Sequence, residues 1–339
     1  MDERTGLRGI GACCLAAGMF LLAGAAPAQT APIEWRFFTY FAPSEHAVKM
    51  NRAFAEEVAK DTGGRLQIRV FAGGELPYKA PDVIRAVATN QVEMGDVAVG
   101  FASGDVPELN VLSLPFLCSS YTQFAKALPD VSPLVDQTLA QRFGVTVAMH
   151  WTMPPQNLWL NRPVAKIDDL KGLKVRSWNA EQVEMMKRLG GSAVSITSAE
   201  VVPALERKVI DGAITSALSA NDWRAYDIVK TGYMVNMTMG HQIMMINSAA
   251  LAKLPADVRE VVLKKARDWA PRYVRMAIDG DEAARANLQK NKVTLIEPAA
   301  EDVAKARALM RPMWDDWARR YGAVGKGLLD ASMKACGAT

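Results

Sequence analysis

The spacing of hydrophobic and polar residues switches repeatedly between the strand period and the helix period, which predicts alternating strands and helices. In the first part of the chain, strands are predicted at 33–38, 66–70 and 97–99. Helices are predicted around Met50–Val58, ending at Gly63-Gly64, and around Val83–Val87. This order of strands and helices is typical of a parallel sheet with helices on both faces.

The same alternation returns after an irregular stretch around Pro107–Pro133. Helices are predicted at Ala180–Leu189 and Glu200–Lys208, and strands at 145–151, 158–160, 173–176, 193–196 and 209–215. A long helical region is predicted from Ala256 to about Asn291, and Pro271 within it predicts a kink or a break because proline removes a backbone donor. Trp314 and Trp317 lie on a last predicted helix, which Pro312 interrupts.

These elements predict an α/β protein built from two β/α halves, whose connections cross near residues 150–155 and 240–250. We expect a first lobe at residues 29–150, to which part of 240–290 returns, and a second lobe at 151–240. Residues 241–339 are expected to supply C-terminal helices and a strand between the lobes. A chain of 339 residues, half of them hydrophobic, is long enough for two such lobes.

The first 28 residues have the pattern of an export signal. Arg4 and Arg8 form a short basic region, an apolar run follows at 10–25, and small residues make an A-x-A pattern at 26–28. The apolar run of about sixteen residues is shorter than the ~20 that a membrane-spanning helix needs, so a cleaved signal is favoured over a membrane anchor. We therefore expect an exported, soluble mature protein.

Charge and cysteine content narrow the classes of function. The net charge of +4 comes from 40 basic and 36 acidic residues, and the basic residues are too scattered for a nucleic-acid-binding stripe. Cys13 and Cys14 fall within the expected signal, which leaves Cys118 and Cys336 in the mature chain. In an oxidising compartment these two are equally compatible with one disulfide and with two free thiols.

Catalytic and metal-binding motifs are missing from the sequence. His46, His150 and His241 are far apart and none belongs to an H-E-x-x-H arrangement, and neither G-x-S-x-G nor a phosphate-binding glycine loop occurs. The adjacent Asp168 and Asp169 point apart and are typical of a solvated turn or helix start. We therefore expect a protein that is not an enzyme and that uses neither a cofactor nor a metal.

Several aromatic residues are candidates for the walls of a ligand pocket, although a tryptophan is more often part of a core. Tyr40 and Phe41 end the first strand, where open α/β sheets hold their ligands, and Phe101 is a further candidate. Four tryptophans qualify in the same way, and these are Trp151, Trp159, Trp178 and Trp223. The methionines between 234 and 245 are expected to fill the core.

The segment GLKVRSWN at 172–179 raises the question of what pairs with its arginine. If it is a strand, Arg176 and Trp178 point to the same face. Arginine is almost never fully buried without a partner. Because Trp178 shares a strand face with Arg176, it is the best aromatic candidate for a ligand site.

At this segment the chain resembles the solute-binding proteins of tripartite ATP-independent periplasmic (TRAP) transporters, of the DctP type. The similar motifs run in order through nearly the whole mature chain. They are AFAEEVAKDTGGRLQIRVF at 53–71, GGEL at 73–76, LSLPFL at 112–117, DDLKGLKVR at 168–176 and SAEVVPALERKVIDGAIT at 198–215. The ordered set, more than any one motif, makes the resemblance specific.

The resemblance implies a two-lobed periplasmic-binding-protein fold, with a β-sheet flanked by helices in each lobe and a long helix spanning both lobes. It implies that Arg176 forms a two-pronged salt bridge with the carboxylate of a solute, which domain closure buries before delivery to the TRAP membrane subunits. Thr215 stands where the family usually has Asn, and Gln156 stands where some members have a second arginine. These differences favour a monocarboxylate, such as an aromatic, 2-oxo or 2-hydroxy acid, with Trp178 and Trp151 as walls.

Three other functions are compatible with part of this pattern. A solute-binding protein of an ATP-driven importer also has two lobes and an export signal, but a long interlobe helix favours the TRAP type. A secreted enzyme lacks its catalytic residues in this sequence. A sensor partner of a membrane receptor has the same sequence features as a transport protein.

Overall fold

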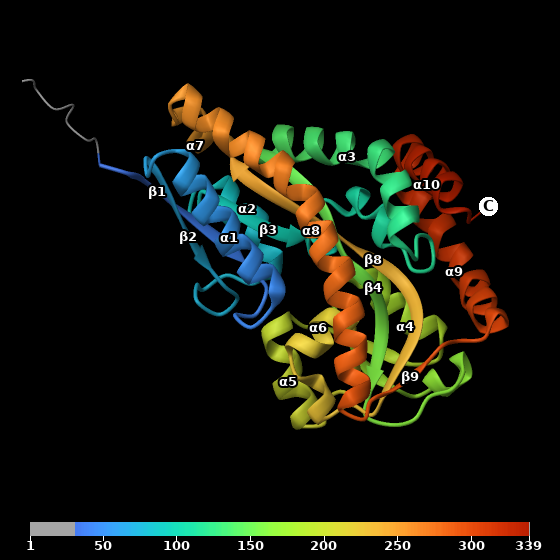
Figure 1. The fold of residues 1–339 in the computed structure, drawn as a ribbon. Helices are drawn as coiled ribbons and strands as arrows, with labels where there is room; N and C mark the ends of the chain where they lie inside the picture. The colour runs from blue at the N-terminus through green and yellow to red at the C-terminus, as the bar shows by residue number, and fades with distance from the viewer. Residues whose placement is uncertain (1–30, 339) are drawn as a thin grey trace, which may run out of the picture. The chain divides into compact units, whose positions relative to one another are not determined.

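The computed structural model describes residues 31–338, and the strands in this part of the chain form one mixed sheet (Figure 1). The strands are β1 (Ile33–Thr39), β2 (Leu66–Phe71), β3 (Met94–Ala98), β4 (Val145–Leu160), β5 (Lys174–Ser177), β6 (Ser192–Ser195), β7 (Gly212–Thr215), β8 (Thr231–Asn247) and β9 (Thr294–Ile296). They follow the order β2-β1-β3-β8-β4-β7-β5-β6, and β9 pairs with β8. The α/β class predicted from the hydrophobic pattern is confirmed.

Ten α-helices surround this sheet in the described residues. They are α1 (His46–Asp61), α2 (Val83–Ala88), α3 (Tyr121–Phe143), α4 (Ala180–Arg188), α5 (Ser198–Glu206), α6 (Ala217–Asp222), α7 (Ser248–Lys253), α8 (Ala256–Lys290), α9 (Ala300–Arg320) and α10 (Gly322–Cys336). Short 3₁₀ helices connect them at Ala80–Asp82, Val99–Gly104, Pro107–Leu109, Val111–Ser113, Ile167–Leu170 and Ala225–Asp227.

The sheet has two parallel parts that are joined by two long antiparallel strands. In the first half, defined here as β1–β3 with α1 and α2, β1 pairs in parallel with β2 and β3. In the second half, β5–β7 with α4–α6, β5 pairs in parallel with β6 and β7. The strands β4 and β8 pair with each other along 145–160 and 231–247 and connect the halves.

Strand β4 corrects the prediction of two separate strands at 145–151 and 158–160. Pro154 and Pro155 lie inside one strand, at a position where the register to β8 shifts between Met153 and Gln156. Proline cannot donate to a ladder and is tolerated at such irregularities. The strand therefore continues, and the irregularity places Gln156 at the junction of the two halves.

The predicted long helix is α8, and it packs against α1, α6 and β4 (Figure 1). Its buried residues recur every three or four positions from Val258 to Leu288, which is the pattern of one helix face on a core. Of the kink or break expected at Pro271, the break is wrong, because the helix runs through this residue without interruption. Pro271 is exposed, so water can satisfy the carbonyl that loses its partner, while Trp269 and Tyr273 are buried on either side.

Prolines also led to wrong predictions at two other helices, where irregular structure or an interruption was expected. The stretch up to Pro133 is irregular only in its first part, since α3 begins at Tyr121 and contains both Pro129 and Pro133. Likewise Pro312 does not interrupt α9, and α10 follows it as a further helix. These prolines are exposed on helices whose opposite faces are buried, so core packing outweighs the lost hydrogen bond.

Cys118 and Cys336 form a disulfide with Cα atoms 5.2 Å apart, which decides between the two alternatives left by the sequence. The bond ties the end of α10 to the segment that precedes α3. The side-chain amide of Gln123 also donates to the carbonyl of Cys336 at 2.6 Å. The C-terminal helix is therefore attached to the core covalently and by polar contacts.

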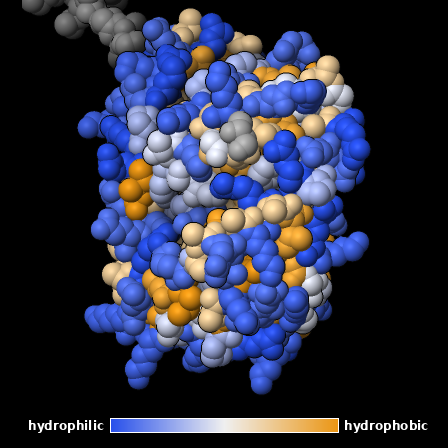
Figure 2. Space-filling model, turned by 90° about the vertical axis from the view of Figure 1, so that its right-hand side faces the viewer, coloured by the Kyte–Doolittle hydropathy of each residue, from blue (hydrophilic) through white to orange (hydrophobic). Residues whose placement is uncertain are grey.

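The surface of the described residues is mainly polar. Figure 2 shows charged and polar residues over most of one face, with hydrophobic residues in separate patches. The large hydrophobic side chains exposed in the described part are Val209, Leu309 and Val324. None of the helices in residues 31–338 is both long and apolar enough to cross a membrane. The expected signal at 1–28 lies outside the described residues.

Candidate functional site

Side chains from both halves of the sheet line a small cavity beside β4 and β8. The lining residues are Tyr40, Phe41, Glu45, Ala98, Phe101, Met153, Gln156, Arg176, Trp178, Ser198, Thr215, Ser219, Trp223, Gly240 and Gln242. The space between their atoms is about 340 Å³, but this volume includes the opening to solvent, so the enclosed cavity is much smaller. The cavity therefore suits a solute of only a few heavy atoms.

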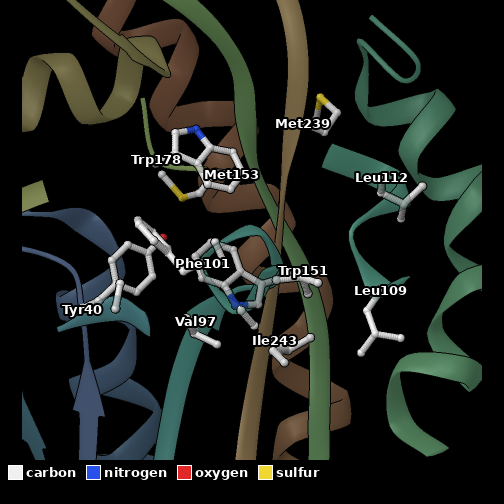
Figure 3. Close-up of a cluster of buried hydrophobic side chains, with 14 of the residues drawn as sticks. Tyr40, Val97, Phe101, Leu109, Leu112, Trp151, Met153, Trp178, Met239 and Ile243 are labelled. Carbon is white, nitrogen blue, oxygen red and sulfur yellow. The ribbon is translucent and has the colours of Figure 1, made fainter. Parts of the chain in front are cut away.

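Aromatic rings form one wall of this cavity. Tyr40 stacks on Phe41 with ring centroids 4.2 Å apart, and Phe101 lies 5.0 Å from Tyr40 and 5.9 Å from Trp178. Figure 3 shows Tyr40, Phe101 and Trp178 grouped on one side of the ribbons of β4 and β8. Gly100 leaves no room for a Cβ atom against the Trp178 ring, so glycine permits the close approach of these segments. The wall thus combines rings from the first half with one from the second.

Arg176 is the charged group of the second half in the cavity. It is only 3 % exposed and lies on β5. Its Nε donates to the carbonyl of Ile196 and its Nη1 to the carbonyl of Ile214, each at 2.9 Å. Neither acceptor is an anion, and no carboxylate of residues 31–338 lies within salt-bridge distance. Backbone carbonyls therefore orient the guanidinium and leave Nη2 without a protein acceptor.

The environment of Arg176 is unfavourable for a charge that has no partner. Burial lowers the pKa of the guanidinium to about 10, although Tyr40 and Glu45 act in the opposite direction. The ring of Trp223 lies 5.6 Å from the guanidinium carbon, a cation–π distance. Arg176 remains charged at neutral pH, so the site presents a poorly solvated cation.

Two uncharged side chains complete the polar part of the cavity on the side of Arg176, one from β4 and one from β7. Gln156 is buried and donates its amide to the carbonyl of Pro154 at 2.7 Å, which leaves its oxygen as an acceptor. Thr215 ends β7, and its carbonyl accepts the indole N–H of Trp159 at 2.9 Å. Trp159 itself belongs to the core, while the Thr215 side chain lines the cavity.

Glu45 is the charged group of the first half in the cavity. Its carboxylate is 2 % exposed and accepts hydrogen bonds from the Ala42 amide at 2.7 Å, the Ser198 hydroxyl at 2.6 Å and the Ser219 hydroxyl at 3.2 Å. Burial raises the pKa of Glu45, whereas the bonds from Ser198 and Ala42 lower it, and the net direction is upward. Ser198 and Ser219 come from the second half, so this carboxylate joins the two halves.

Further polar contacts between the halves lie near the cavity. Asp222 of α6 accepts the backbone N–H of His46 at 2.9 Å and lies 2.6 Å from its Nδ1. Lys79 and Glu200 form an exposed ion pair at 2.9 Å. Glu45 of the first half therefore accepts hydrogen bonds from the second half, and Asp222 of the second half accepts one from the first.

The structure brings together all but one of the predicted ligand-binding residues. Tyr40, Phe41, Phe101, Gln156, Arg176, Trp178 and Thr215 line the one cavity. Trp151 does not, because its ring is fully buried between Phe41 and Tyr273 at centroid distances of 6.0 and 4.9 Å. It supports the wall from behind, as the core interpretation of a tryptophan allows.

Sequence reasoning missed several residues of the site. Glu45 follows Tyr40 and Phe41 in the same loop between β1 and α1. Its place after the end of the first strand is a sequence feature that could have identified it as a candidate for the ligand site. Ser198 is the first residue of α5 and belongs to the motif SAEVV. Trp223 is one of the four tryptophans that the sequence offers as candidates for a pocket wall, with nothing to distinguish it from the others. Gln242, whose oxygen accepts the Tyr40 hydroxyl at 3.2 Å, carried no signal, because it lies in a long buried strand.

The histidines separated in the sequence are partly close in space. Nδ1 of His150 lies 3.0 Å from Nε2 of His241, and Nε2 of His150 lies 2.8 Å from Asp136. Residues 31–338 contain no group of three or more His, Cys, Asp or Glu side chains that could hold a metal ion. The expected core role of the methionine cluster at 234–245 is confirmed, since all five are buried.

Comparison with known proteins places this geometry in a family. The family model described as DctP, bacterial extracellular solute-binding protein family 7, matches residues 38–320. A solute-binding protein of Chromohalobacter salexigens is 26 % identical over 91 % of this chain and 92 % of its own length.

Two solved structures from Bordetella pertussis are similar over nearly their whole length. DctP7, an extracytoplasmic solute receptor binding pyroglutamic acid, is 29 % identical with a TM-score of 0.84, covering 88 % of this chain and 99 % of its own. DctP6, a receptor binding the same acid, is 26 % identical with a TM-score of 0.85, covering 89 % and 99 %. The expected two-lobed fold is confirmed by this likeness.

Proposed function

Because this chain belongs to bacterial extracellular solute-binding protein family 7, the DctP family, we propose that it captures a small monocarboxylate for a TRAP transporter. The solute binds in the cavity around Arg176, its carboxylate accepts hydrogen bonds from the guanidinium, and the closed protein presents it to the membrane subunits. The proposal includes export to the periplasm by the N-terminal segment.

The observation that carries the proposal is the buried guanidinium of Arg176. A buried charge is costly unless it is paired, and the contacts of Arg176 in the described chain are carbonyls and a tryptophan ring. Its planar fork can donate two parallel N–H bonds to one carboxylate. A carboxylate solute supplies the missing anion, and it does so in a cavity whose lining residues are buried.

The remaining walls limit the body of the solute. The rings of Tyr40, Phe101 and Trp178 favour a flat or apolar body, and the small cavity favours a short one. Gln156 and Glu45 offer acceptors, which suit an N–H or O–H group on the solute. Pyroglutamate combines one carboxylate, a flat ring and an N–H donor, and receptors 29 % and 26 % identical to this chain bind it. Aromatic, 2-oxo and 2-hydroxy monocarboxylates are the other candidates.

Calorimetry on Arg176 variants tests this function. Thermal-shift screening of a carboxylate panel first selects the ligands that stabilise the wild-type protein. Arg176→Ala is expected to weaken their binding roughly 150- to 4000-fold, because breaking a buried ion pair costs about 3–5 kcal/mol. Arg176→Lys is expected to weaken binding as well, because an ammonium lacks the two-pronged geometry.

Arg142→Ala is the matched control, since this arginine pairs with Glu108 and does not line the cavity. It should leave the affinities unchanged. Near-normal affinity in Arg176→Ala, with a protein that still unfolds cooperatively, would contradict the proposed site. A wild-type protein that binds no carboxylate of the panel would contradict the solute class.

A further inference from the structure

We infer that Glu45 is a specificity-determining residue, which restricts the site to solutes with a single carboxylate by repelling a second one. The inference rests on the proposed function, since it assumes that the first carboxylate is held by Arg176. It adds a residue that selects against a class of solute, which is a role separate from that of Arg176.

The hydrogen bonds of Glu45 fit an ionised carboxylate. An amide N–H can only donate, and the Ala42 amide points to the oxygen that also accepts the Ser198 hydroxyl. The other oxygen accepts the Ser219 hydroxyl. Glu45 is the N-cap residue of α1, yet its side chain makes no capping bond to that helix. The carboxylate is therefore held in the cavity wall by donors outside its own helix.

The charges around the cavity leave no cation for a second anionic group. Among all lining residues the ionisable ones are Tyr40, Glu45 and Arg176. Burial raises the pKa of Tyr40 well above its usual value, so this phenol is neutral. Arg176 is thus the one cation that lines the cavity, and it faces both Glu45 and the first carboxylate of a solute.

The small size of the cavity would bring the second carboxylate of a dicarboxylate close to Glu45. Because Glu45 and Arg176 line the same small cavity, a second carboxylate on a solute anchored at Arg176 would be buried close to Glu45. Like charges at close range in a buried site oppose ionisation of both groups. Gln156, at the junction of the two halves, offers no positive charge to compensate. A neutral N–H or O–H donor at the same place can instead donate to Glu45.

The test is the substitution Glu45→Gln, which keeps the shape of the side chain and removes its charge. The dissociation constants of pyroglutamate and succinate are measured by calorimetry for the wild-type protein, Glu45→Gln and Asp222→Asn. Asp222 is the matched control, because it is a buried carboxylate that joins the halves but does not line the cavity. Thermal unfolding without ligand verifies that each variant is folded.

In Glu45→Gln we expect succinate to bind at least about tenfold more tightly relative to pyroglutamate than in the wild-type protein. Asp222→Asn should change both affinities by the same factor. Succinate binding that does not improve in a folded Glu45→Gln protein would overturn the inference, as would a wild-type protein that prefers succinate. If Arg176→Ala still binds pyroglutamate normally, the proposed function fails instead, so the two failures are distinguishable.

Discussion

Asp96, like Arg176, is a buried ionisable residue, and its protonation state affects the stability of the protein. It lies on β3 with no exposed surface, and its Oδ2 accepts the side-chain amide of Asn51 at 2.6 Å. Asn51 in turn accepts the Tyr273 hydroxyl of α8 at 2.5 Å. Burial raises the pKa of Asp96 to about 7, even though hydrogen bonds from Thr39 and Asn51 lower it. Unlike Arg176, this side chain can become neutral by binding a proton.

The stability of the protein should therefore depend on pH through Asp96. Its pKa rises from 3.8 in the unfolded chain to about 7 when folded, so the folded protein binds the extra proton between these values. The resulting stabilisation is fully present below pH 4 and is lost as the pH rises through 7. Asp96→Asn should gain about 2–3 kcal/mol relative to the wild-type protein between pH 5 and pH 8, measured by urea unfolding. Parallel pH profiles of the two proteins would contradict this.

At the scale of elements, exposed prolines lie inside helices that the core holds in place. Helices α3, α8 and α9 each contain at least one proline, and in each the opposite face is buried in the core. A missing backbone bond on the solvent side costs less than the apolar contacts of a long helix contribute. The C-terminal helix α10 also buries one face in the core, and the bond between Cys118 and Cys336 holds it in addition.

Loss of this disulfide should lower stability without changing the site. The bond closes a loop of 218 residues, and a disulfide typically stabilises by about 2–4 kcal/mol because it restricts the unfolded chain. The double variant Cys118→Ser with Cys336→Ser should lose about that much in urea unfolding and keep its ligand affinity. Dithiothreitol should destabilise the wild-type protein and have no effect on the double variant. Equal free energies of unfolding for the double variant and for the wild-type protein with its disulfide formed would show that the bond contributes nothing to stability.

The elements show where sequence patterns succeed. Strands β1, β2 and β5 and helices α1, α4 and α8 were predicted within a few residues, because alternation and helical spacing are local properties. Helix α3 and the continuity of β4 were missed, because both contain prolines whose cost is offset by tertiary contacts. The pairing of β4 with β8 joins residues 71 to 102 positions apart, which no local sequence pattern can indicate.

At the scale of the whole described molecule, polar contacts between the halves surround the cavity. Glu45 accepts from Ser198 and Ser219, and Asp222 accepts from His46 in the opposite direction. The strands β4 and β8 pair with each other and connect the two halves, and α8 packs against α1 of the first half and α6 of the second. If the protein opens to exchange solute, the contacts must break, whereas β4 and β8 need only bend.

Weakening one of these contacts should speed the release of solute. Asp222→Asn removes the charged acceptor of the His46 backbone N–H, and the loss of about 1–2 kcal/mol should raise the dissociation rate roughly 5- to 30-fold. Stopped-flow measurement of tryptophan fluorescence can follow this rate, since Trp178 and Trp223 line the cavity. Lys79→Ala, which breaks only an exposed ion pair, should change it less than about twofold. Equal rates in all three proteins would show that these contacts do not hold the closed form.

The sequence by itself determined the α/β class and most of the elements, and it singled out Arg176 as the candidate binding residue. Those features depend on residue spacing and on the motifs around GLKVRSWN, which are local in the chain. Only the tertiary structure decided that Cys118 and Cys336 are bonded, that Trp151 supports the wall without lining it, and that Glu45 faces the same cavity as Arg176. These properties depend on which distant segments meet, and the folding of both halves onto β4 and β8 sets those distances.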